Sequence, residues 1–327
     1  MSLRFRHMHL LLKERVVYRD VLKELFRPIG AVPGNMRRVK WNPKSYALLD
    51  YPIVKDGQVR VAVVFHAYYM QDLSYYFSHL SNISVKFDLL VTVPREEFRI
   101  IFQKELLKYN LNLDKVIICV SQNKGRNFAP FLIHFGKTLV KDYDLFLHIH
   151  TKQSAHSPHL KYWPNFLISN LLHSTELVNR IISVLSHSPN IGLAYPTTYA
   201  HLGHITDPWD GNISLARNTL KKLNFREFEE DFIFPAGGMF WANVNSLTEL
   251  LNFDWKYEDF SDEDHIDPEL FQIPYVIERL ISVIPILKAF ECIYLSSGQL
   301  TFDHSFASRT GILDRFWDRV FIRKLEH

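Results

Sequence analysis

The sequence predicts an α/β protein with a mostly parallel, doubly wound central sheet. Between residues 59 and 152, short apolar runs that suit buried strands alternate with longer amphipathic stretches that suit helices. Of the 327 residues, 47% are hydrophobic, which is enough to build the core of such a sheet. Polar side chains follow the apolar runs at their carboxyl ends, where open parallel sheets usually bind ligands.

Four strands and three helices account for the first half of this pattern. The strands are predicted over 59–69, 87–93, 114–122 and 143–152, and the helices over 73–83, 96–110 and 130–142. Pro94 closes the second strand, and Pro130 suits the first turn of a helix. Since each helix connects one strand to the next, the strands are expected to be parallel.

The second half is less regular. Helices are predicted over 165–187, 214–223 and 274–287, a strand over 190–196, and a second strand over 232–244 that Gly237 and Gly238 interrupt. Paired glycines inside a strand indicate a close approach of the backbone to another group. We expect an N-terminal extension over 1–58, one domain over 59–306, and a C-terminal helix with a tail over 307–327. The first and last three residues are interpreted as remnants of cloning.

The positive charge is concentrated at the N-terminus. Residues 1–60 hold 13 Lys and Arg against 5 Asp and Glu, a net charge of +8, whereas the whole chain has a net charge of +3. Residues 11–26 alternate basic and apolar residues at helical spacing, which suits a helix on an anionic membrane surface and equally a helix packed on the main domain. No nucleic-acid recognition motif accompanies this charge, so we expect no nucleic-acid partner.

The composition also restricts the compartment. Cys119 and Cys292 are the two cysteines and lie far apart, so neither a disulfide framework nor a thiolate metal site is indicated. No consecutive apolar run reaches the roughly 18 residues of a bilayer span, and the N-terminus lacks a signal-peptide core. We therefore expect a cytoplasmic protein.

The strand predicted over 143–152 carries His148, His150 and Lys152 to its carboxyl end. Lys152 and a protonated or hydrogen-bonding imidazole could bind a diphosphate directly. Alternatively, the two histidines alternate on one face of the strand and could bind a metal ion, although Mg²⁺ prefers oxygen ligands. In a third interpretation the pair is only hydrogen-bonded to neighbouring loops.

Three motifs connect the sequence to a known family. They are NKGRNFAPF at 123–131, HIHTK at 148–152 and FPAGGMFWA at 234–242, with IERL at 277–280 after them. Together they resemble the rhamnan synthesis protein F family of bacterial polysaccharide glycosyltransferases. The resemblance implies a GT-A-like, Rossmann-type nucleotide-sugar-binding domain that transfers a hexose, with dTDP-rhamnose as the expected donor. The implied acceptor is a lipid-linked or growing cell-surface polysaccharide of the rhamnan or O-antigen type, at the cytoplasmic face of the inner membrane.

The resemblance also implies a donor site. Its expected members are His66, Tyr68, Thr92, Asn123, Gly125, Arg126, Asn127, His148, Gly237 and Gly238. Tyr68 or Tyr69 would stack on the nucleobase and Thr92 would hydrogen-bond its edge, while Arg126 and Asn127 would reach the sugar or the phosphates. The family has an aspartate at the position of Asn127, which alternatively could serve only to cap the following helix.

Catalysis is expected to depend on Glu278, Lys152 and His150. In an inverting transfer Glu278 would accept the proton of the acceptor hydroxyl, and the alternative bases are the acidic residues Asp262, Glu263, Asp264 and Asp267. Arg279 would orient Glu278, although the two could equally form a helix salt bridge. Trp241 and Asp264 are the expected acceptor contacts. GT-A enzymes usually bind Mg²⁺ or Mn²⁺ through Asp-x-Asp at the position of His148. We therefore expect no required cofactor, with a divalent cation held by the two histidines as the alternative.

Two other function classes fit the sequence. A metal-dependent hydrolase could use the His-x-His motif, although in such enzymes the motif usually follows the first strand rather than the fourth. A non-catalytic protein that binds nucleotide sugars or glycans would explain both Asn127 and the missing Asp-x-Asp.

Overall fold

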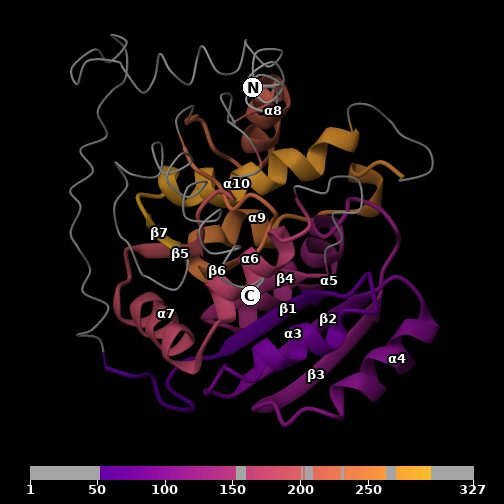
Figure 1. Ribbon diagram of the computed structural model, residues 1–327. Coiled ribbons are helices and arrows are strands. Elements are labelled where there is room, and N and C mark those ends of the chain that lie inside the picture. Colours follow the sequence, from indigo (N-terminus) through magenta and orange to yellow (C-terminus); the bar gives the residue numbers. More distant parts are fainter. Residues whose placement is uncertain are drawn as a thin grey trace, which may run out of the picture. The chain divides into compact units, whose positions relative to one another are not determined.

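A computed structural model describes residues 52–151, 160–199, 202, 209–229, 232–262 and 270–295. In this part of the chain, seven strands form one sheet in the order β3-β2-β1-β4-β6-β5-β7, with helices on both faces (Figure 1). The helices expected over 11–26 and within 307–327 lie outside the described residues, as do Lys152 and Asp264.

The first half of the sheet is parallel, as predicted. Its strands are β1 (Val61–His66), β2 (Phe87–Val93), β3 (Leu113–Val120) and β4 (Leu145–His150), and its helices are α3 (Leu73–Leu80), α4 (Glu96–Leu106) and α5 (Phe128–Asp142). β1 lies between β2 and β4, and β2 pairs with β3, all in parallel. The carboxyl ends of four neighbouring strands therefore meet at one edge.

The second half contains a reversal that the sequence pattern did not indicate. β6 (Phe240–Asn243) runs antiparallel between β4 and β5 (Ile191–Pro196), and the sheet ends with β7 (Glu291–Leu295), which is parallel to β5. The strand expected over 232–244 is thus only four residues long, because Gly237 and Gly238 turn the chain at positive φ just before it. β7 was not predicted, because a mostly apolar run of five residues is too short for its periodicity to distinguish a strand from other structure.

The helix predicted over 165–187 is two helices, α6 (Trp163–Leu172) and α7 (Thr175–His187). The chain breaks at Ser174, whose side chain accepts a hydrogen bond from the Leu177 backbone N–H as the N-cap of α7. The remaining helices are α8 (Ile213–Lys222), α9 (Thr248–Asn252) and α10 (Ile273–Leu287), with 3₁₀ turns over Val244–Leu247, Tyr257–Asp259 and Leu270–Gln272. α8 and α10 confirm the helices predicted there.

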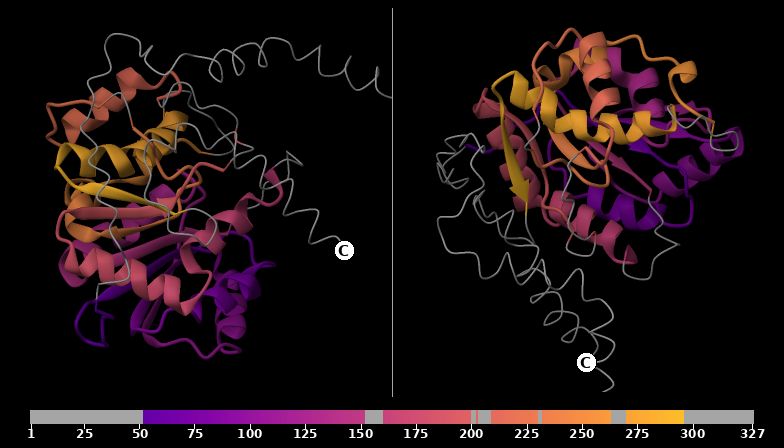
Figure 2. Two further views of the ribbon diagram at one scale, coloured as in Figure 1. Left: turned by 60° about the vertical axis from the view of Figure 1, so that its left-hand side comes forward. Right: turned by 90° about the horizontal axis from the view of Figure 1, so that it is seen from above.

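Helices cover both faces of the sheet (Figure 2), and the buried apolar side chains form two cores, one on each side of it. One core contains side chains of α3, α4, α6 and α7, and the other contains side chains of α5, α8, α9 and α10. Alternate strand residues point to opposite sides, so Val63 lies in the first core and Val64 in the second. By the same alternation, His66, His148 and His150 lie on the side of α5 and α10. The described residues thus form a Rossmann-like α/β fold.

Among the described residues, one helical stretch, Leu270–Leu287, has the length and apolar composition of a membrane span. Of this stretch, 61% is buried inside the fold. Its apolar character is accounted for by α10 packing in the second core.

Candidate functional site

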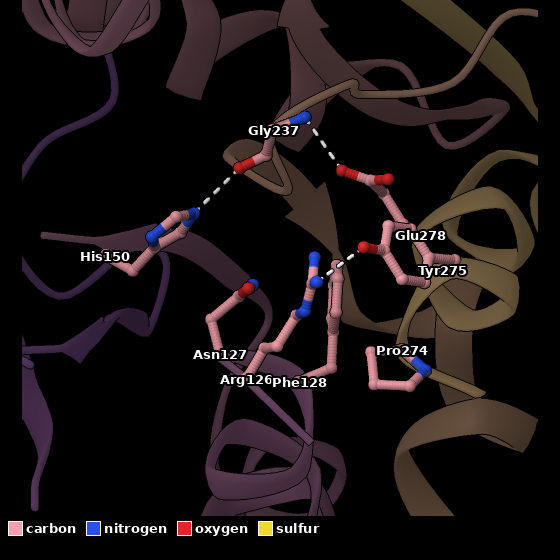
Figure 3. A pocket seen from close by; sticks show the side chains of 8 residues that line it. All are labelled: Arg126, Asn127, Phe128, His150, Gly237, Pro274, Tyr275 and Glu278. Carbon is pink, nitrogen blue, oxygen red and sulfur yellow. Dashed lines mark hydrogen bonds between the residues drawn. The ribbon is translucent and has the colours of Figure 1, made fainter. Parts of the chain in front are cut away.

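A small pocket opens at the carboxyl edge of the sheet, where the fold class places a ligand site. It is lined by Arg126, Asn127, Phe128, His150, Gly237, Pro274, Tyr275 and Glu278 (Figure 3). These residues come from the start of α5, the end of β4, the turn before β6 and the start of α10. The free space is about 50 Å³, which suits a small group such as part of a sugar ring.

Two histidines hold the glycine turn that forms one wall of the pocket. The His148 Nδ1 lies 2.6 Å from the Gly238 carbonyl oxygen, and the His150 Nε2 lies 2.7 Å from the Gly237 carbonyl oxygen. Gly237 and Gly238 have φ of +98° and +67°, which L side chains rarely adopt. A Cβ on Gly238 would lie 2.9 Å from the Asn127 Nδ2. The close approach of the backbone predicted at Gly237 and Gly238 is confirmed, and the groups that it approaches are protein side chains.

This arrangement does not suit a metal ion. A carbonyl oxygen can only accept, so the His148 Nδ1 and the His150 Nε2 each carry a proton in these contacts and have no lone pair for a metal. The remaining nitrogen of His148, Nε2, keeps a lone pair but is buried. Both ring nitrogens of His150 face carbonyls, since its Nδ1 lies 3.3 Å from the Thr151 oxygen. Within the described ranges, no three His, Cys, Asp or Glu side chains cluster as metal ligands. A pair of imidazoles, with both nitrogens of His150 facing carbonyl groups, does not suit Mg²⁺ or Mn²⁺, which prefer oxygen ligands.

The expectation that His148 contacts the donor is also wrong. Its ring is fully buried and packs against the rings of Phe131 and Phe240, with centroids 4.5 and 5.4 Å away. Burial lowers the pKa of His148 to about 4, so the imidazole is neutral at neutral pH and offers no charge to a phosphate. The interpretation of a pair hydrogen-bonded to neighbouring loops is the one that the described geometry supports.

Glu278 meets the same turn from the opposite side. Its Oε1 accepts a hydrogen bond of 2.8 Å from the Gly237 backbone N–H, and its Oε2 lies 3.4 Å from the Arg279 guanidinium. The side chain of Arg279 is 6% exposed, donates to the Tyr275 carbonyl and lies over the Phe234 ring, 4.4 Å from its centroid. The carboxylate of Glu278, 17% exposed, is therefore oriented at the pocket wall.

Asn127 contributes a side-chain amide whose nitrogen is not used by the described part of the fold. It occupies the N-cap position of α5, but its side chain makes no capping hydrogen bond, so the capping interpretation is wrong. Its Nδ2 is buried and has no hydrogen-bond partner among the described residues. In Figure 3 the amide points into the space between His150 and Arg126. A buried donor without an acceptor is unfavourable in the free protein and is available to a ligand.

Arg126 lies at the opening beside Asn127. Its φ of +55° is in the left-handed region, which is uncommon for a residue other than glycine and frequent at functional sites. The guanidinium carbon lies 4.2 Å from the centroid of the Tyr275 ring, and the guanidinium donates to the Tyr275 hydroxyl. Gly125 is buried against Phe260 and does not line the pocket, and Asn123 is exposed away from it.

The predicted nucleobase contacts are only partly on the surface. The His66 Nδ1 lies 2.8 Å from the Thr92 Oγ1, and the two residues are 7% and 1% exposed. Burial, followed by the nearby His148, lowers the pKa of His66 to about 3. In this structure His66 and Thr92 are therefore buried and pair with each other, and neither presents a free polar edge to a base. Tyr68, in the loop after β1, is partly exposed.

Trp241 does not contact an acceptor. It is fully buried, belongs to the core on the side of α6 and α7, and donates from its Nε1 to the Leu171 carbonyl. The neighbouring Phe240 points to the side of the pocket instead. The expectation failed because the alternation along β6 sends position 241 to the opposite face of the sheet.

Sequence reasoning did not identify four residues that the structure brings to this edge: Phe128, Thr151, Pro274 and Tyr275. Tyr275 precedes Glu278 by three residues, which places both on one face of α10. That spacing could have indicated Tyr275 once Glu278 was chosen. The HIHTK motif contains Thr151 but does not indicate its contact, because Thr151 lies 82 positions after the loop residue Tyr69 that it contacts.

A family model described as rhamnan synthesis protein F matches residues 28–290, which include every residue that lines the pocket. The chain belongs to the rhamnan synthesis protein F family. The resemblance noted in the motifs is confirmed, and the chain is thereby connected with rhamnan and polysaccharide synthesis.

Two curated relatives match part of this family member. They are the uncharacterized proteins WxcX of two strains of Xanthomonas campestris pv. campestris, each 29% identical over 163 residues. The match covers 50% of this chain and 23% of each relative, so the relatives are much longer than the matched region. A crystal structure of a mycobacterial protein aligns with 79% of this chain and 75% of its own, at 14% identity and a TM-score of 0.33.

Proposed function

We propose that this protein is a GT-A-like glycosyltransferase that transfers a hexose from a nucleotide donor to a growing polysaccharide. The observation that carries the proposal is the pocket at the carboxyl edge of a Rossmann-like sheet, in which Glu278 and the Asn127 amide face one space. The Nδ2 of that amide has no hydrogen-bond partner in the part of the chain that the structure describes. Membership of the rhamnan synthesis protein F family supports this class of reaction and makes L-rhamnose, from dTDP-rhamnose, the proposed sugar.

The balance of charge in the pocket suits a sugar ring better than a diphosphate. Arg126 and the Asn127 amide can donate hydrogen bonds, whereas the carboxylate of Glu278 accepts them. Sugar hydroxyls both donate and accept, so one ring can pair with all three groups. A carboxylate would repel a phosphate, so we assign the diphosphate to Lys152, beyond the described end of β4.

In the proposed reaction, Glu278 is the general base of an inverting transfer. An acceptor hydroxyl oxygen attacks the anomeric carbon, and its proton passes to the Glu278 carboxylate. The bond between the anomeric carbon and the phosphate oxygen breaks, and its electron pair leaves with the nucleoside diphosphate. The Gly237 N–H and Arg279 orient the carboxylate for this step. The proposed acceptor is lipid-linked, and the basic residues 1–60 suit attachment to the cytoplasmic face of the inner membrane.

The proposal is tested by incubating the protein with dTDP-rhamnose, UDP-glucose and GDP-mannose, with and without lipid-linked glycan acceptors, and measuring release of the nucleoside diphosphate. We expect turnover with one donor and a loss of about 100-fold or more in Glu278→Gln. The amide retains an oxygen that can accept from Gly237, so the turn is preserved. Glu176→Gln, an exposed change on α7, is the matched control and should leave turnover unchanged.

Tight binding of a nucleotide sugar without turnover would instead identify a non-catalytic binding protein. Turnover that Glu278→Gln leaves unaffected would remove Glu278 from the mechanism. Failure to bind or convert any nucleotide sugar would overturn the proposal as a whole.

A further inference from the structure

Thr151, the residue after β4, is 3% exposed, and its hydroxyl accepts hydrogen bonds from the loop after β1. Its Oγ1 accepts hydrogen bonds from the backbone N–H groups of Tyr68 and Tyr69, at 2.9 and 2.8 Å. Its own N–H donates to the His66 carbonyl at 3.0 Å, which extends the pairing of β1 and β4 by one residue. A threonine hydroxyl has two acceptor lone pairs, and both are used here.

The loop that it holds joins β1 to α3. The first amide of the loop, that of Ala67, donates to the Thr92 carbonyl at 2.9 Å, so the strands on both sides of β1 fix three consecutive amides. Tyr68 and Tyr69 are partly exposed, and their ring centroids lie 5.0 Å apart at an interplanar angle of 78°. The His66 ring lies beneath, with its centroid 6.0 Å from that of Tyr68. Two partly exposed aromatic rings are thus presented at the edge where His150 lines the pocket.

We propose that Thr151 is a positioning residue that fixes the backbone of this loop so that Tyr68 presents its ring to the nucleobase of the donor. This inference rests on the proposed function. Without the hydroxyl, two backbone N–H groups would lose their acceptor, and the loop would rearrange to reach water. A preformed ring surface saves the cost of ordering the loop when the ligand binds.

The test is a double-mutant cycle on binding of dTDP and UDP, measured by calorimetry, with urea unfolding of each variant in parallel. Thr151→Val keeps the shape of the side chain without the hydroxyl, and Thr151→Ser keeps the hydroxyl. For the nucleotide that the wild-type protein binds more tightly, we expect Thr151→Val to weaken binding roughly tenfold, the effect of losing one stacked base, and Thr151→Ser to bind as the wild type does. In a Tyr68→Ala background, Thr151→Val should cause no further loss.

Each other outcome counts against the inference. Wild-type affinity in Thr151→Val would overturn it while leaving the proposed function intact. So would a loss of affinity in Thr151→Val that is fully additive with the loss in Tyr68→Ala, because Thr151 would then act independently of that ring. If the wild-type protein bound neither nucleotide, this inference would be overturned, whereas the proposed function would still be decided by the turnover assay with all three nucleotide sugars.

Discussion

At the scale of the residue, a substitution of Asn127 can distinguish a role in ligand binding from a role in stability. Its side chain neither caps α5 nor finds another partner among the described residues, although its Nδ2 is buried. Removing an unused buried donor costs the free protein little and relieves a desolvation penalty. The same change costs the complex a hydrogen bond.

We therefore expect Asn127→Ala to unfold at the same or a higher urea concentration than the wild-type protein, and to bind a nucleotide sugar about fivefold more weakly. Ser174→Ala is the matched control, because Ser174 does cap α7 and its loss should cost about 1 kcal/mol. A loss of stability in Asn127→Ala as large as that in Ser174→Ala would show that the amide has a structural partner.

At the scale of the element, the junction between β3 and α5 depends on one glycine. Gly125 has φ of +64°, and a Cβ there would lie 2.5 Å from both Ala129 and the Phe260 ring. The residues on either side of Gly125 have different contacts. Lys124 forms an ion pair with Asp262, and Arg126 lines the pocket. The geometry of the junction therefore sets where α5 presents Asn127.

Gly125→Ala should lower the free energy of unfolding by several kcal/mol, because the strained backbone adds to a steric clash. Gly57→Ala is the control, since Gly57 has φ of +81° and open space around its Cβ position, and it should lose only about 1 kcal/mol. Urea unfolding of both variants measures the difference. Equal losses would mean that the contact with Phe260 adjusts without cost.

At the scale of the whole molecule, the two buried imidazoles make stability depend on pH. The pKa values of His66 and His148 are lowered to about 3 and about 4, whereas an unfolded histidine titrates near 6.5. Between these values the unfolded chain binds protons that the folded chain does not, so the free energy of unfolding decreases as pH falls from 6.5 towards 4. For one histidine, each pH unit by which the folded pKa lies below the unfolded pKa lowers the free energy of unfolding at acidic pH by up to about 1.4 kcal/mol.

Urea midpoints measured between pH 7 and 4 should therefore fall steeply for the wild-type protein and less steeply for His66→Gln. His173→Gln, a change at an exposed histidine, should leave the slope unchanged. Identical slopes in all three proteins would show that His66 is not kept neutral by the fold.

The periodic pattern of the sequence was sufficient for the fold class, for most helices and for the parallel half of the sheet. Burial imposes a repeat on the residues themselves, so strands such as β1 and helices such as α10 are visible before any packing is known. The motifs likewise indicated the family, and they led to Arg126, Asn127 and Glu278, which line one pocket.

Only the tertiary structure decided what the polar residues do. The antiparallel insertion of β6 turns Trp241 away from the pocket and brings two glycine carbonyls to His148 and His150. Local sequence cannot encode these outcomes, because they depend on strand direction and on contacts between distant segments, such as the 87 positions that separate His150 from Gly237. The sequence by itself therefore determined which side chains reach the carboxyl edge of the sheet. Tertiary packing determined which of them line the pocket and which form contacts within the fold.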